Sequence, residues 1–77
     1  SEHFEEFRAL RYKLSQDENI PPYIVFSDKT LNEISQKLPT TKEEFLAING
    51  VGEMKLQKYG DIFMWLCEKI RESKILP

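Results

Sequence analysis

NIPPYIVFSD, residues 19–28, is the stretch that decides the fold. Its two prolines, Pro21 and Pro22, stop a helix and hold the local backbone extended. The four residues at 23–26 then have the composition of a β-strand. Four residues with no second strand to pair with cannot form a sheet. We therefore expect a buried loop or a single turn here.

The rest of the chain has apolar residues at helical spacing. Capping residues mark where two helices begin, with Ser27 before one and Thr41 with Glu44 before another. Gly60 interrupts the last apolar stripe, and we expect it to divide that stripe into two helices. The predicted helices cover about 3–16, 28–37, 42–48, 53–59 and 61–72. The predicted fold class is all-α, a compact bundle of about five short helices.

The length of 77 residues predicts a single domain, with a core over about residues 4–72. The chain has 11 basic and 13 acidic side chains, for a formal charge of −2. No apolar run approaches the roughly 18 residues of a membrane span. Cys67 is the only cysteine, so a disulfide framework is excluded. The N-terminus has no basic start or apolar stretch, so we expect no secretory signal. A reducing, cytoplasmic setting fits the single cysteine best. We also expect the chain to be a monomer.

Catalysis by this chain is not expected. A domain of this size buries only about 60–65% of the surface that its unfolded chain exposes, which leaves little room for a deep cleft. His3 and Cys67 lie at opposite ends of the sequence, without the spacing of metal ligands. Cys67 falls on the last apolar stripe and is interpreted as a buried small hydrophobe. We expect no catalytic residue, no metal and no cofactor.

The turn formed by Asn49, Gly50, Val51 and Gly52 is a candidate phosphate site. A turn of this kind leaves backbone N–H groups free at the start of the next helix, where they can hold a phosphate oxygen. Two basic residues, Lys55 and Lys58, follow one and two turns further along and add positive charge. The alternative is a tight turn between two packed helices, and the spacing leaves both interpretations open.

Two aromatic residues are candidates for contact surfaces. Tyr23 follows the double proline, and an exposed tyrosine held in this way can stack on a nucleobase. The alternative for Tyr23 is a core aromatic. Trp65 points away from the last apolar stripe on a helical wheel, as an exposed contact residue would. The alternative that we favour for Trp65 is burial on both sides of the helix, or cover by the tail at 75–77.

Several segments together resemble the HRDC domain, which is named for helicase and RNase D C-terminal. The segments are FEEFRALR at 4–11, IPPYIVFSDKTL at 20–31, LP at 38–39, FLAINGVG at 45–52, KL at 55–56 and KYG at 58–60. The resemblance covers about residues 4–72. It is greatest to the HRDC domains at the C-terminus of bacterial RecQ-type DNA helicases.

This resemblance implies an auxiliary domain, excised from a larger ATP-dependent helicase of the bacterial cytoplasm and nucleoid. It implies weak binding of single-stranded or structured DNA, and tuning of how the helicase engages its substrate in DNA repair and recombination. The partners implied are DNA and the helicase core. In bacterial members the aromatic residue after the double proline is a candidate for contact with nucleic acid, and that position is Tyr23 here. The basic companions that match are Arg8, Arg11, Lys55 and Lys58.

The net acidic charge departs from the pattern of DNA-binding modules, which usually carry an excess of basic residues. We therefore expect few phosphate contacts and an affinity that is micromolar or weaker and steeply dependent on salt. Two alternatives remain open. One is a protein-interaction or regulatory module that docks on the helicase core or on a partner, and the other is the C-terminal domain of an RNase D-like exonuclease.

Overall fold

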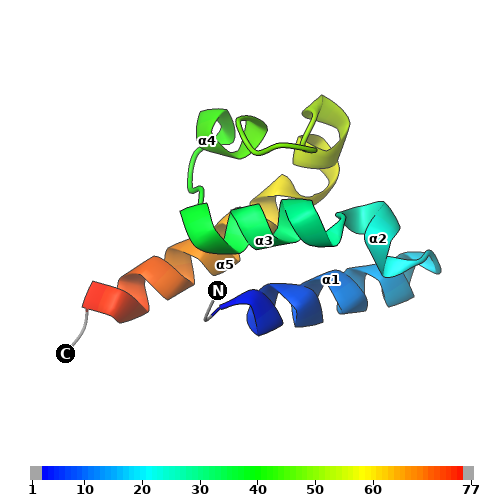
Figure 1. Ribbon diagram of the computed structural model, residues 1–77, viewed down its shortest axis with the longest axis horizontal. Helices are drawn as coiled ribbons and strands as arrows, with labels where there is room; N and C mark the ends of the chain where they lie inside the picture. Colours follow the sequence, from blue (N-terminus) through cyan, green and yellow to red (C-terminus); the bar gives the residue numbers. More distant parts are fainter. Residues whose placement is uncertain (1–2, 76–77) are drawn as a thin grey trace.

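The computed structural model describes residues 3–75, and the helices in this range enclose one core (Figure 1). They are α1 (Phe4–Glu18), α2 (Pro22–Val25), α3 (Asp28–Lys37), α4 (Lys42–Leu46) and α5 (Glu53–Ile75). No strand occurs among the described residues, so the all-α prediction is confirmed. In that range, no helix combines the length and the apolar character needed to span a membrane.

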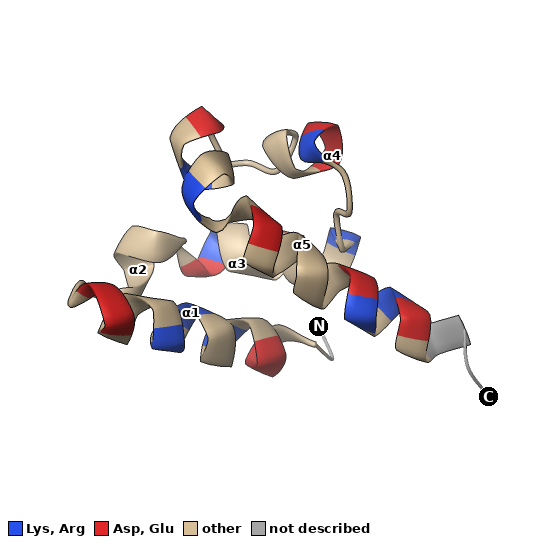
Figure 2. Ribbon diagram, turned by 180° about the vertical axis from the view of Figure 1, so that it is seen from behind, with Lys and Arg blue, Asp and Glu red and all other residues tan. Residues whose placement is uncertain are grey.

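The short helix α2 connects the two longer helices α1 and α3, which lie side by side (Figure 1). Seen from behind, α5 crosses in front of α3 (Figure 2). The short helix α4 packs against α5. Pro22 is the first residue of α2, where its missing N–H is no loss. Val25 and Phe26 are fully buried, whereas Tyr23 and Ile24 are exposed. The prediction of a single turn is confirmed, although only its second half is buried.

Local signals set the predicted ends of α3 and the start of α4. The Ser27 hydroxyl accepts a hydrogen bond from the Thr30 N–H at 3.2 Å, and α3 covers the predicted residues 28–37. The Thr41 hydroxyl accepts from the Glu44 N–H at 3.1 Å. The Glu44 carboxylate accepts in turn from the Thr40 N–H at 2.9 Å, which lowers the pKa of Glu44. Both capping predictions are therefore confirmed.

The prediction that Gly60 divides the last stripe is wrong, because α5 runs unbroken from Glu53 to Ile75. Gly60 is buried, and a Cβ atom there would lie 2.8 Å from the Cδ1 atom of Leu56. The glycine therefore relieves crowding inside the helix. The cost of a glycine in a helix is only about 1 kcal/mol, which packing of the flanking turns can offset. The ribbon of α5 bends in its yellow part, near residue 60 (Figure 1).

Phe26 lies at the centre of the aromatic core. Its ring centroid is 5.0 Å from that of Phe63, 5.8 Å from that of Tyr59 and 6.1 Å from that of Phe45. The pairs with Phe63 and Tyr59 are edge-on, and aromatic pairs of this kind contribute about 0.5–1.5 kcal/mol each beyond the burial of their area. Phe7 of α1 stacks on Phe63 from the other side, with centroids 6.2 Å apart. The residue after α2 thus joins α4 and α5 in one core.

Arg11 is largely buried beside this core. Its side chain is 8% exposed, and its Nη1 atom lies 2.8 Å from a carboxylate oxygen of Asp28. The same Nη1 donates a hydrogen bond to the backbone oxygen of Phe26 at 2.9 Å. The expectation that Arg11 meets nucleic acid therefore needs correction. Its guanidinium instead ties α1 to the segment between α2 and α3.

Replacing Arg11 by methionine tests this structural role. We expect Arg11→Met to lower the free energy of unfolding by about 1–3 kcal/mol, because the buried Phe26 carbonyl loses its donor. Arg8→Met is the matched control: Arg8 is an exposed arginine of the same helix, and we expect a change within about 0.5 kcal/mol. Urea denaturation followed by circular dichroism measures both. Equal effects of the two substitutions would contradict the role given to Arg11.

Candidate nucleic-acid interface

Tyr23 projects from α2 into solvent. It is 67% exposed, so the alternative of a core aromatic is wrong. Two prolines precede it, and the buried Val25 and Phe26 follow it. The turn is therefore anchored on its inner side while the ring of Tyr23 stays free for contact. A ring held in this way loses little conformational entropy when a ligand stacks on it.

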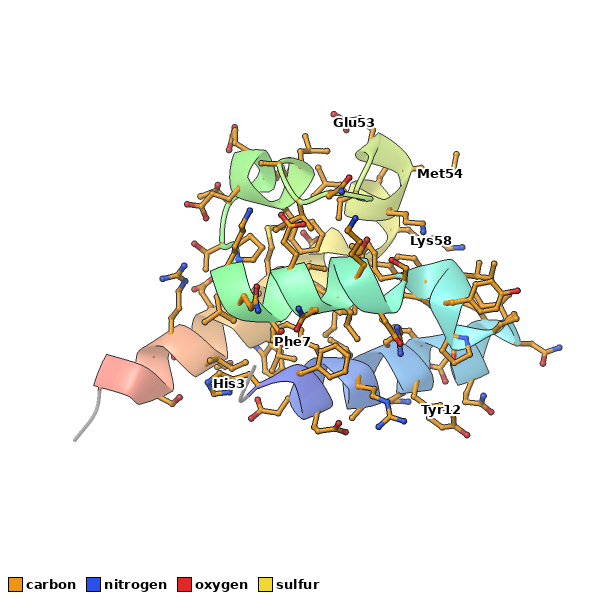
Figure 3. The ribbon with its side chains drawn as sticks, viewed as in Figure 1. His3, Phe7, Tyr12, Glu53, Met54 and Lys58 are labelled. Atoms are coloured by element: carbon orange, nitrogen blue, oxygen red, sulfur yellow. The ribbon has the colours of Figure 1, made fainter. Side chains whose placement is uncertain are left out.

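Two lysines of α5 lie close to the ends of α2. The Nζ atom of Lys58 is 2.7 Å from a carboxylate oxygen of Glu18, the last residue of α1 before the turn that leads to α2. The Nζ atom of Lys55 is 5.6 Å from the ring centroid of Phe26, the residue that follows α2. Figure 3 shows Lys58 beside α2. The fold thus brings both lysines to the helix that carries Tyr23.

The charge of Lys58 is partly compensated within the protein. Its hydrogen bond with Glu18 lowers the pKa of Glu18 and raises the pKa of Lys58. Burial raises the pKa of the neighbouring Tyr59 hydroxyl, and its hydrogen bond with Glu18 adds to this effect. A phosphate that binds Lys58 must therefore compete with the Glu18 carboxylate.

Arg8 lies on the surface of α1. Its Nη1 atom is 3.1 Å from a carboxylate oxygen of Glu5, and both side chains are exposed. Arg8 lines a hollow of about 330 Å³ that extends to Tyr12 and to Pro22. Tyr12 is 58% exposed, and the sequence analysis did not single it out. Its position one turn after Arg8 is the signal that could have found it.

The glycine turn lies against the first turn of α3. Gly50 has φ +93°, and a Cβ atom there would collide with the hydroxyl oxygen of Thr30. The same hydroxyl donates a hydrogen bond to the backbone oxygen of Asn49 at 2.8 Å. Val51 is buried, and Gly52 is exposed just before α5 begins. These contacts fit the alternative of a tight turn between packed helices, and Gly52 remains the member closest to the lysines in sequence.

Charged residues of both signs share the surface around α2. Figure 2 shows α2 without charged residues, and basic and acidic segments follow one another along α1 and α5. Arg8 and Lys58 thus have acidic partners on α1, Glu5 and Glu18, whereas Lys55 lies over the ring of Phe26. Among the described residues, no cluster of His, Cys, Asp or Glu side chains is suited to hold a metal ion.

Trp65 and Cys67 occupy opposite sides of α5. Trp65 is 53% exposed and lies under the Nζ atom of Lys69, at 6.0 Å from the ring centroid. Burial on both sides of the helix is therefore wrong, and the side chains of the tail at 75–77 lie outside the described residues. Cys67 is fully buried, as predicted, and desolvation raises the pKa of its thiol to about 12.

Comparison with known proteins gives one family. The sequence model of the HRDC domain matches residues 1–67 of the chain. The proteins called ATP-dependent DNA helicase RecQ from Haemophilus influenzae and Pasteurella multocida are 50% and 48% identical to it over 66 residues, which is 86% of the chain. The protein of the same name from Bacillus subtilis is 46% identical over 61 residues, or 79% of the chain.

The matched segment spans about a tenth of each of these relatives, at 11%, 10% and 10% of their lengths. The relatives therefore share this one domain with the chain. The match covers the helices α1 to α4 and most of α5. The chain belongs to the HRDC domain family, whose members are accessory domains without catalytic activity of their own.

Proposed function

We propose that this HRDC domain belongs to a RecQ-type DNA helicase and binds single-stranded DNA weakly through the surface around α2. The observation that carries the proposal is the exposed ring of Tyr23 on an anchored turn. Lys55 lies over the ring of Phe26, which follows this turn, and Lys58 pairs with Glu18, which precedes it. The relatives named above are helicases, which favours a helicase parent over an RNase D-like exonuclease. In such a parent the domain tunes substrate engagement during DNA repair or recombination, in the bacterial cytoplasm near the nucleoid.

Stacking supplies the sequence-independent part of this binding. Every nucleobase has a π-face, so an exposed tyrosine accepts any base, and each stacked base is worth about 1–3 kcal/mol. An unpaired base is required, because the bases of a duplex already stack on one another. A ring on a fixed turn thus favours single strands over intact duplex DNA.

Phosphate contacts supply the remainder and keep the affinity low. Arg8 and Lys58 each already have an acidic partner, Glu5 and Glu18 respectively, and the chain as a whole has a charge of −2. Few phosphates can be neutralised at this surface, so the affinity is low. Each contact adds only about 0.7 to the slope of log K against log salt, so the dependence on salt is shallow rather than steep. In the proposed interface, Gly52 lies at the start of α5, whereas Asn49, Gly50 and Val51 fix the turn that positions the two lysines.

The Tyr23 ring is the first element to test. We expect Tyr23→Ala to weaken binding of fluorescein-labelled oligo-dT about 5- to 150-fold at low salt, because one stacked base is lost. Tyr23→Phe should bind like the wild type, since the ring is kept. Fluorescence anisotropy measures all three proteins. Absence of saturable binding by the wild type at high micromolar concentration would exclude this function.

The Glu18–Lys58 ion pair offers a gain-of-function test. We expect Glu18→Gln to tighten oligo-dT binding a few-fold, because Lys58 is then free to pair with a phosphate. The slope of log K against log salt should become more negative by about 0.7, the value for one added contact to a single strand. Glu72→Gln is the matched control, since it removes the same charge from another lysine pair, 3.6 Å from Lys69.

An equal gain from Glu18→Gln and Glu72→Gln would show that only net charge matters, and it would remove Lys58 from the interface. The two variants have the same formal charge, so any difference between them comes from position. Lys69 and Glu72 lie on the later turns of α5, in the red half of the helix in Figure 1.

A second function, docking on the helicase core or another protein, is favoured by Trp65. This ring is 53% exposed, and Ile62 is exposed one turn earlier on the same helix. Exposed tryptophan is enriched among residues that dominate protein interfaces. In this proposal the partner covers Trp65 and Ile62, and the surface around α2 stays open.

Chemical-shift mapping with the helicase core of a RecQ-type parent tests the docking function. We expect the perturbed amides to cluster at Trp65, Ile62 and Lys69, and Trp65→Ala to abolish the perturbation because the anchoring ring is lost. Tyr23→Ala is the control and should leave this contact unchanged. A spectrum that does not respond to the core would contradict docking at this face.

A further inference from the structure

A hollow lies between α1 and α2. Its wall on α1 is one stripe of the helix, with Glu5, Arg8, Ala9 and Tyr12 at spacings of three and four residues. Pro22, the first residue of α2, forms the opposite wall. Tyr12 points outward from α1 below α2 (Figure 3). The volume of about 330 Å³ lies at the lower end of the range of about 300–1,000 Å³ for small-ligand pockets.

The chemistry of these walls suits one nucleotide. Tyr12 is 58% exposed and offers an aromatic face, and Arg8 offers a guanidinium that can pair with phosphate in a bidentate way. The small side chain of Ala9 leaves room between them. Arg11 also lines the hollow, but Asp28 compensates its charge. An aromatic face and a neighbouring cation are the two elements of single-strand binding sites.

The hollow is continuous with the surface that carries Tyr23. Pro22 lines the hollow, and Tyr23 is the next residue of the same helical turn. A strand that extends from Tyr23 over Pro22 therefore enters the hollow that Tyr12 lines. The two tyrosines come from different helices, and Pro22 links the hollow to the turn that carries Tyr23.

We propose that this hollow binds the nucleotide next to the one that stacks on Tyr23, with its base on Tyr12 and its phosphate on Arg8. The proposal rests on the proposed function, because it assigns a second nucleotide position to the same strand. It makes Tyr12 a binding residue, and it makes Glu5 a residue that limits affinity. The Glu5 carboxylate, 3.1 Å from Arg8, competes with the incoming phosphate for the guanidinium.

The first experiment removes the ring of Tyr12. Anisotropy titration of labelled oligo-dT should show binding about fivefold weaker or more for Tyr12→Ala, and unchanged for Tyr12→Phe. Trp65→Ala is the matched control, because Trp65 is an aromatic of similar exposure on α5 and outside the hollow. Both substituted side chains are exposed in the wild type, and circular dichroism checks that the three variants are folded.

The second experiment leaves the tyrosine in place and changes the rest of the hollow. Ala9→Leu fills the space with a residue that favours helix, and we expect it to weaken binding like Tyr12→Ala. Glu5→Gln should tighten binding and make the salt slope more negative by about 0.7. This gain should disappear when Glu5→Gln is combined with Arg8→Gln, because the guanidinium that would pair with the phosphate is then absent.

The outcomes separate this proposal from the function on which it rests. If Tyr23→Ala weakens binding and Tyr12→Ala and Ala9→Leu do not, the second nucleotide position is overturned and the DNA-binding function stands. If Trp65→Ala weakens binding as much as Tyr12→Ala does, stacking is unspecific and the proposal is again overturned. If the wild type fails to bind oligo-dT, both are overturned. A loss for Tyr12→Ala and Ala9→Leu with the Trp65 control unchanged supports the site.

Discussion

The backbone oxygen of Phe26 and the guanidinium of Arg11 form the contact on which the rest of the structure depends. The ring of Phe26 packs among three aromatic residues of α4 and α5, while its carbonyl oxygen holds α1 through Arg11. The side chain and the backbone of Phe26 thus both make contacts in the interior of the domain. Because Phe26 directly follows α2, its fixed position also fixes the turn. Tyr23 is exposed because the burial of Val25 and Phe26 turns the other side of the helix toward solvent.

Surface charge in this domain is organised in local pairs. Lys58 pairs with Glu18 across 40 residues of sequence, and Arg8 pairs with Glu5 one turn away. An anion that binds Arg8 or Lys58 must displace a carboxylate that is already in place. In the function proposed above, a single strand does so because its bases stack on aromatic rings while its phosphates compete for the cations. In that proposal the acidic balance of the chain limits the affinity, and the exposed aromatic residues determine where the strand binds.

Local patterns predicted most of the helix boundaries, because their causes are local. Ser27 caps α3 through a residue three positions away, and α3 has the predicted bounds. Gly60 and Arg11 were misjudged for the opposite reason. Gly60 stays in a helix because of how neighbouring turns pack, and Arg11 is buried because a carbonyl group 15 residues away accepts its hydrogen bond. Trp65 points as the helical wheel indicates, and the described residues do not bury it.

The buried thiol of Cys67 gives the domain a practical chemical property. Only the thiolate form of cysteine reacts readily with maleimides, iodoacetamide or peroxide, and this thiol stays protonated because its pKa is raised to about 12. Full burial adds a steric barrier to any reagent. A cysteine introduced on the surface can therefore carry a dye or a spin label at one defined position, without first replacing the native residue. Cys67 keeps its place in the core while the label reports on the surface.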